Sequence, residues 1–181
     1  MPRLRVPALD DLKPEQRAVW ARTLAGRRGV VPANVRVWLL SPDLASRAQA
    51  LGEFLRYNTT LHVRQAELAI LVVARRWSAQ YEWGVHAVEA VRAGVSAEVI
   101  AAIRERRPPA FDDATDRAVF ELASALVVDG RVSDETYRTA VADLGERATV
   151  ELVGLVGYYT MVAFTLNTFE VAPPPGAPVL D

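Results

Sequence analysis

The sequence predicts an all-α fold, a single-domain helical bundle, and three observations lead to this prediction. Apolar residues recur at the three- and four-residue spacing of a helix along nearly the whole chain. No run of β-branched residues lies between hairpin turns, as strands would require. With 181 residues, 51% of them hydrophobic, the chain has the size of one ordinary domain and can bury its own core. We expect one domain over residues 1–181, with a loosely ordered N-terminal segment and a proline-rich tail at residues 171–181.

The first two expected helices are bounded by residues that start or stop helices. The first covers residues 14–24 and ends before two closely spaced glycines. The second begins after Ser41, which we expect to cap it, with Pro42 in its first turn. It continues to Tyr57, where the polar cluster NTT interrupts it.

Two adjacent helices follow and are expected to form a hairpin. The first spans about residues 64–77, RQAELAILVVARRW, and is so apolar that most of it should be buried. The second holds the stretch YEWGVHAVEA and ends at Gly94, a suitable left-handed C-terminal cap. Because only a few residues join the two helices, we expect them to lie antiparallel.

The last helices are separated by further caps, of which Ser96 and Gly130 are the clearest. The loop RERRPPAFDDAT is the longest internal interruption. The tail VAPPPGAPVLD cannot be helical, so it is either an extended arm or a disordered end. The remaining expected helices cover residues 96–104, 115–128, 133–145 and 147–168.

Composition excludes several classes of function. The 21 basic and 22 acidic residues give a net charge of -1, which supplies no field for holding nucleic acid or an anionic membrane. The absence of cysteine excludes disulfides, thiolate nucleophiles, thiol redox cycling and cysteine-ligated zinc. Lys13 is the only lysine and lies in a polar stretch, which argues against Schiff-base chemistry.

Neither a membrane span nor a targeting segment is expected. The longest apolar stretch, residues 152–166, is shorter than the ~20 residues that cross a bilayer, so it is interpreted as a buried helix. The N-terminus lacks the apolar region of a secretory signal. We therefore expect a cytoplasmic protein.

A carboxylate and an imidazole four residues apart form the main candidate site. Ala79, Glu82, Trp83 and His86 share one face of the second hairpin helix by their spacing. Glu67, in the apolar run of the first helix, needs a partner because an unpaired buried carboxylate is costly. Folding back of the hairpin would bring the imidazole between two carboxylates, which should hold it protonated, whereas burial alone would discharge it. Either balance can give a proton donor.

This spacing resembles that of the carboxymuconolactone decarboxylase and alkylhydroperoxidase-D-like superfamily, whose motif is E-x11-C-x2-C-x3-H. Glu67, Ala79, Glu82 and His86 occupy its four places, so the spacing is kept and both thiols are missing. The likeness also includes ELAILVVAR and AVRAGVSAEVI on either side. Because both thiols are missing, thiol peroxidase chemistry is not expected. A glutamate four residues before the histidine is similar to the decarboxylase branch.

The resemblance implies an all-helical subunit of the alkylhydroperoxidase-D-like type, assembled as a homotrimer or homohexamer with its pocket near the interface. It implies a lyase that removes CO2 from a small unsaturated lactone or keto acid, with His86 as proton donor or acceptor and Glu82 and Glu67 as its partners. No nicotinamide, flavin or metal is implied. A cationic imidazole backed by a carboxylate suits this chemistry, since it can hold a delocalised anion and deliver one proton.

Five further residues are candidates for binding the acid substrate. Arg56 and Tyr57 can hold a substrate carboxylate by a guanidinium fork and a phenol, and Arg76 is a second candidate for this. Tyr81 and Trp83 are pocket walls or packing residues. A hydroxyl of the pair Tyr158-Tyr159, on the last helix, can also reach the pocket.

Other interpretations of the same residues stay open. His86 can be a core histidine satisfied by Glu82. Glu67 can be a structural brace for a nearby arginine, namely Arg64, Arg75 or Arg76. One histidine and two carboxylates can also form a metal site. Finally, the scaffold can be a non-catalytic oligomeric binding module.

Overall fold

The computed structural model describes residues 3–181, and within them the chain forms nine α-helices, a short 3-10 turn at Leu9–Asp11 and no strand. The prediction of an all-α fold is confirmed. The helices are α1 (Pro14–Ala25), α2 (Ala33–Trp38), α3 (Pro42–Tyr57), α4 (Val63–Arg76), α5 (Gln80–Arg92), α6 (Ala97–Arg104), α7 (Ala114–Asp129), α8 (Asp134–Leu144) and α9 (Glu146–Thr168).

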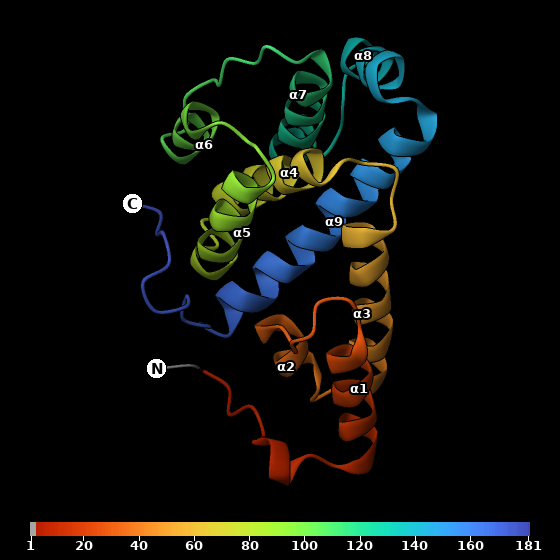
Figure 1. Ribbon diagram of the computed structural model, residues 1–181, viewed down its shortest axis with the longest axis vertical. Helices are drawn as coiled ribbons and strands as arrows, with labels where there is room; N and C mark the ends of the chain where they lie inside the picture. Colours follow the sequence, from red (N-terminus) through yellow and green to blue (C-terminus); the bar gives the residue numbers. More distant parts are fainter. Residues whose placement is uncertain (1–2) are drawn as a thin grey trace.

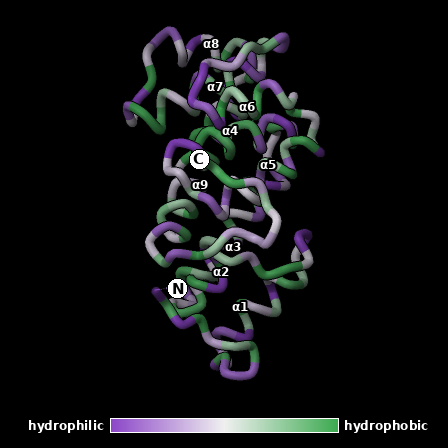
Figure 2. Tube along the Cα trace, turned by 90° about the vertical axis from the view of Figure 1, so that its left-hand side faces the viewer, coloured by the Kyte–Doolittle hydropathy of each residue, from purple (hydrophilic) through white to green (hydrophobic). Residues whose placement is uncertain are grey.

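Helix α4 forms the centre of the bundle. It packs against α5, α7 and α9, and every residue from Gln65 to Ala74 is buried. Helices α1 to α3 occupy one end of the molecule and α7 and α8 the other, while the long α9 runs diagonally between them (Figure 1). Along the chain, hydrophobic and hydrophilic residues alternate within the helices, as expected where one side of each helix packs inward (Figure 2).

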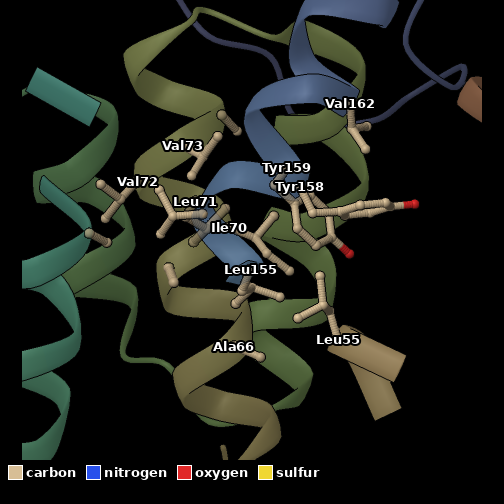
Figure 3. Close-up of a cluster of buried hydrophobic side chains, with 14 of the residues drawn as sticks. Leu55, Ala66, Ile70, Leu71, Val72, Val73, Leu155, Tyr158, Tyr159 and Val162 are labelled. Atoms are coloured by element: carbon tan, nitrogen blue, oxygen red, sulfur yellow. The ribbon is translucent and has the colours of Figure 1, made fainter. Parts of the chain in front are cut away.

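The core between α4 and α9 provides a rigid support for the candidate site. Ile70 and Leu71 from α4 and Leu155 from α9 are completely buried (Figure 3). Each such side chain contributes about 1.5–3 kcal/mol through burial. The rings of Tyr158 and Tyr159 leave α9 on the side away from the aliphatic cluster of α4 (Figure 3), so the same helix contributes to the core and to a polar region.

The observed helix boundaries agree with the predicted ones within about two residues, with two corrections. The six-residue helix α2 (Ala33–Trp38) was not predicted, because less than two turns show no clear period. Ser41 precedes α3 as expected, but its side chain makes no capping hydrogen bond. Gly94 adopts positive φ at the end of α5, as predicted, and Gly130, predicted as the stop of α7, also adopts positive φ.

Helix α9 is the one helix in the described part of the chain that is long and apolar enough to span a membrane by length and composition. In the bundle, 56% of its most apolar window is buried, and Leu152 and Leu155 are completely inaccessible. This agrees with the interpretation of the segment as a buried helix.

The proline-rich tail is extended and lies against α5. The side chain of Gln80 accepts a hydrogen bond from the Leu180 N–H at 2.8 Å and donates one to the Leu180 carbonyl at 2.9 Å. Leu180 is only 5% exposed. Gly84 lies under the tail, where a Cβ would be 3.0 Å from the Cβ of Ala177. The tail therefore covers the outer side of the helix that carries the histidine.

One close contact between α3 and α9 predicts opposite effects for two glycine substitutions. Tyr158 Oη lies directly against Gly52, whereas a Cβ at Gly157 would meet nothing within 4 Å. We expect Gly52→Ala to lower the free energy of unfolding by about 1–3 kcal/mol, because the tyrosine has to move. Gly157→Ala should raise it by up to about 1 kcal/mol through helix propensity alone. Denaturant unfolding of both variants tests the contact, and equal effects would contradict it.

Candidate active site

A tight turn between α4 and α5 brings the two halves of the candidate site together. Ser78 adopts a left-handed conformation with φ of 48°, just after α4 ends. Its N–H donates to the Arg75 carbonyl at 3.3 Å, and the Ala79 N–H donates to the Ala74 carbonyl at 2.9 Å. This pairing is a Schellman motif, which reverses the chain within a few residues. Helix α5 therefore packs back along α4, as predicted.

The hairpin joins Glu67 of α4 to His86 of α5. His86 Nδ1 lies 2.6 Å from Glu67 Oε2, and both residues are buried, with 5% and 2% of their surface exposed. The other oxygen of Glu67 lies 3.3 Å from Arg56 Nη2, at the end of α3. One carboxylate thus connects an imidazole and a guanidinium from three helices.

Burial decides the protonation of this pair. Removal from water lowers the pKa of His86 below its usual value, although the charge and hydrogen bond of Glu67 act in the opposite direction. Burial alone would raise the pKa of Glu67, but His86 and Arg56 lower it overall. At neutral pH we therefore expect an ionised Glu67 that accepts a hydrogen bond from the Nδ1–H of a neutral His86.

The His86 ring borders a cavity of about 430 Å³, within the range of small-molecule sites. Its Nε2 makes no hydrogen bond within residues 3–181 and is not among their completely buried unpaired atoms, so it opens onto this cavity. The Tyr159 ring meets the His86 ring edge to face, with centroids 5.2 Å apart. The cavity is lined by Arg28, Val30, Pro32, Asn34, Arg56, Tyr57, Tyr81, Glu82, Val85, His86, Glu89, Tyr158, Tyr159, Val162 and Leu166.

Glu82 also lines the cavity, but its carboxyl group has no partner. Both oxygens are completely buried and form no hydrogen bond. Burial raises the pKa of Glu82 well above its usual value, so we expect a neutral carboxylic acid at pH 7. A neutral carboxyl group adds no negative charge to the wall of the cavity.

Two expectations about His86 are therefore corrected. The imidazole is not flanked by two carboxylates, because only Glu67 is bonded to it, and Glu82 at i-4 does not satisfy it. The expectation that carboxylates hold the ring protonated is also wrong, since desolvation outweighs the single carboxylate. The alternative partners of Glu67 are engaged elsewhere: Arg64 with Asp113 and Asp116, Arg75 with the Arg104 carbonyl, and Arg76 with the Val127 carbonyl.

The structure brings three of the five predicted substrate-binding residues to the cavity. Arg56, Tyr57 and Tyr81 line it. Trp83 is 1% exposed and belongs to the hydrophobic core instead. Arg76 is exposed and donates to the Val127 carbonyl at 2.9 Å, so it lies away from the cavity. Neither residue lines the cavity beside His86.

Arg28 and Asn34 also line the cavity, and sequence reasoning missed them. They come from the segment between α1 and α2 and from α2 itself, where no motif marks a site. The two glycines around Arg28 predict a break after the first helix, but the sequence does not show that the side chain of Arg28 lies at the cavity. Tyr158 and Tyr159 were identified as residues able to reach the pocket, and both line it.

Within residues 3–181, no group of three or more His, Asp or Glu side chains is arranged to hold a metal ion. His86, Glu67 and Glu82 therefore do not form the triad that their sequence suggested as one alternative. Glu67 directs its oxygens to His86 and Arg56.

Comparison with known proteins supports the resemblance found in the sequence. Residues 42–125 match the carboxymuconolactone decarboxylase family. This segment runs from the start of α3 into α7 and includes Glu67, Glu82 and His86. Among curated proteins, none matches the chain in sequence.

Several solved structures share the fold. An uncharacterised peroxidase-related protein from Silicibacter sp. TM1040 has a TM-score of 0.78 at 14% identity, covering 97% of this chain and 93% of its own. An Agrobacterium tumefaciens protein of unknown function, suggested to be the antioxidant defence protein AhpD, has a TM-score of 0.66 at 18% identity, covering 76% and 94%. The debrominase Bmp8 in its apo form has a TM-score of 0.74 at 15% identity, covering 93% and 90%.

Proposed function

From the match of residues 42–125 to the carboxymuconolactone decarboxylase family, we propose that the protein is a cofactor-independent lyase. Its substrate is a small unsaturated lactone or keto acid that loses CO2, and His86 carries the proton. The observation that carries the proposal is the buried His86, held at Nδ1 by Glu67 at 2.6 Å, with Nε2 open to the cavity.

The reaction follows from this geometry. When the bond between the substrate carbon and its carboxylate breaks, CO2 leaves and the electron pair enters the conjugated system as an enolate. Protonated His86 then gives its Nε2 proton to the substrate carbon and regains a proton from water. Glu67 keeps its hydrogen bond to Nδ1 throughout, so Nε2 is the nitrogen that gains and loses the proton.

The remaining cavity groups suit an anionic reactant. Arg28 and Arg56 both contribute guanidinium groups to the cavity wall, and the neutral Glu82 adds no negative charge that would oppose an anion. The partly closed site also has apolar walls, including Val85, Val162 and Leu166, which reduce the competition from water. A negatively charged reactant also favours the protonated form of His86.

The proposal predicts a specific pH dependence. Because burial lowers the pKa of His86, the proton donor of the free enzyme is lost as pH rises through a value below 6.5. We expect kcat/KM to fall on the alkaline side of that value, about tenfold for each pH unit. In kcat the midpoint should lie higher, since bound anion raises the pKa of His86 again. Rates measured between pH 4.5 and 9 test this, and a rate that rises with pH would favour an isomerase that begins with a base.

The activity can be tested by a survey of unsaturated lactone acids and keto acids, following CO2 release and ultraviolet absorbance. We expect at least one compound to be decarboxylated by the wild-type protein and not by His86→Ala. Unchanged turnover in the variant would show that the imidazole does not carry the proton. If no compound is turned over, the lyase proposal fails and the binding-module alternative gains support.

A metal-dependent enzyme is the alternative that elemental analysis separates from this proposal. Stoichiometric iron, manganese or zinc in the purified protein would favour it. The geometry gives it less support, because Glu67 is already bonded to His86 and Arg56.

We also propose that the protein is cytoplasmic and forms a homotrimer or homohexamer. Support for assembly comes from apolar side chains exposed on two helices. On α9, Val150 is 71% exposed and Phe164 is 49% exposed, and on α3, Leu51 is 48% exposed. Burying such residues between subunits is favourable. Sedimentation equilibrium gives the subunit number, and a monomer at micromolar concentration would contradict the proposal.

A further inference from the structure

A four-residue turn between α1 and α2 carries two arginines toward the site. The Gly29 N–H donates to the Gly26 carbonyl at 3.0 Å, which closes the turn around Arg27 and Arg28. Gly29 has a φ of 67°, a conformation that suits glycine. The sequence GRRG therefore fixes the backbone from which both guanidinium groups extend.

The two arginines have different surroundings. Arg27 Nη1 donates to the Tyr57 carbonyl at 3.3 Å, and its guanidinium lies 5.2 Å from the centre of the Tyr57 ring. This attaches the turn to the end of α3. Arg28 is half-buried at the cavity wall and forms no ion pair or hydrogen bond with any residue in the range 3–181. Its donors are thus available to a molecule in the cavity.

Charge compensation separates Arg28 from the other cation of the cavity. Arg56 lies 3.3 Å from a Glu67 oxygen, so its charge is already balanced. Glu89, another acidic residue of the cavity wall, lies 2.7 Å from Arg92. Glu82 has no partner and is expected to be neutral. The uncompensated charge of the cavity is therefore that of Arg28.

The positive charge of Arg28 extends into the site. Burial raises the pKa of Glu67 and lowers that of His86, and Glu67 and His86 act on each other in the opposite direction. Arg28 lowers both pKa values, after the larger effect of Arg56. It also acts against the rise that burial causes at the Tyr158 and Tyr159 hydroxyls. Because the Arg28 guanidinium affects all of these cavity groups, it is close enough to attract an anion bound in the cavity.

We propose that Arg28 binds the carboxylate of the ligand and selects small organic acids whose body is planar and apolar. This inference rests on the proposed function, and it moves the carboxylate contact expected at Arg56 to a residue outside residues 42–125. The rest of the ligand lies against Val85, Val162 and the Tyr159 ring. A carboxylate can accept two parallel hydrogen bonds from an arginine, which gives orientation as well as affinity.

Calorimetric titration with benzoate and with its neutral analogue benzamide tests the assignment without turnover. We expect benzoate to bind the wild-type protein more tightly than benzamide, and Arg28→Gln to weaken benzoate about tenfold or more while leaving benzamide unchanged. The matched control is Arg131→Gln, because Arg131 is exposed and also lacks a partner within the described chain. This variant removes the same charge from a residue that does not line the cavity, and it should bind benzoate as the wild type does.

Equal benzoate affinity in the wild type and in Arg28→Gln would overturn the assignment, as would the absence of any preference for benzoate over benzamide. Thermal unfolding without ligand shows whether each variant is folded. The same titration on His86→Ala separates this inference from the lyase proposal. Arg28-dependent benzoate binding without turnover of any acid would refute the lyase and keep the binding residue, whereas turnover with Arg28-independent binding would do the reverse.

Discussion

Glu67→Gln is expected to lower kcat by about 100- to 10,000-fold while the protein stays folded. The carboxylate lies 2.6 Å from Nδ1 of His86 and, in the proposed reaction, stabilises the imidazolium that gives up its proton. A neutral amide provides no such charge, and its NH2 group can donate to Nδ1, which would place the ring proton on Nε2. The variant and wild type are compared with the substrate found in the survey.

The same substitution has a readout that needs no substrate. Glu67 raises the pKa of His86 against the larger effect of burial, so its neutralisation should lower that pKa further. Nitrogen NMR of the ring follows this titration. Glu151→Gln is the matched control, because Glu151 is also a buried carboxylate but bonds to Thr60 and Arg147, away from the cavity. Unchanged kcat and pKa in Glu67→Gln would contradict the role of the pair.

Glu82→Gln is expected to make the protein more stable than the wild type, by an amount that grows with pH. Burial raises the folded-state pKa of Glu82 above the unfolded value, so the folded protein keeps a proton that the unfolded chain releases above about pH 4.5. Between the unfolded and folded pKa values of Glu82, the wild type loses about 1.4 kcal/mol of stability per pH unit relative to the Glu82→Gln variant, which has no titrating group at this position. Glutamine has nearly the same shape and no charge.

Denaturant unfolding at several pH values between 5 and 9 measures this difference. Glu151→Gln should behave in the opposite way. Although burial alone would raise the pKa of Glu151, hydrogen bonds from Thr60 and Arg147 lower it, so its ionised form stabilises the fold. Parallel stability curves for Glu82→Gln and the wild type would show that Glu82 titrates normally in the folded state.

Features set by local spacing could be predicted from the sequence. The caps at Ser96 and Gly130 and the short connection after Trp77 fix where helices end and reverse. Once two long helices lie antiparallel, Glu67 and His86 face each other because each lies on the apolar side of its helix. The family motif has the same spacing, so it can be identified in this sequence although both cysteines are replaced.

Features set by side-chain orientation could not be predicted. Glu82 shares a face with His86, but only the packed hairpin shows that Glu67 reaches the ring and that Glu82 does not. Helical periodicity shows only roughly which side of a helix a residue lies on. Trp83 and Arg76 were therefore predicted at the cavity, but Trp83 packs in the core and Arg76 bonds to the Val127 carbonyl. Arg28 comes from a turn whose direction depends on its contacts with α3, which are distant in sequence.

The walls of the cavity come from separate parts of the chain, and this matters for redesign. Glu67 and His86 belong to the α4–α5 hairpin, while Arg28, Val30 and Asn34 come from a segment before residue 42, outside the family match. A library of variants randomised at those three positions could be screened for binding of other ligands without altering the Glu67–His86 contact. Directed evolution of ligand selectivity could thus proceed in one segment while the α4–α5 hairpin stays unchanged.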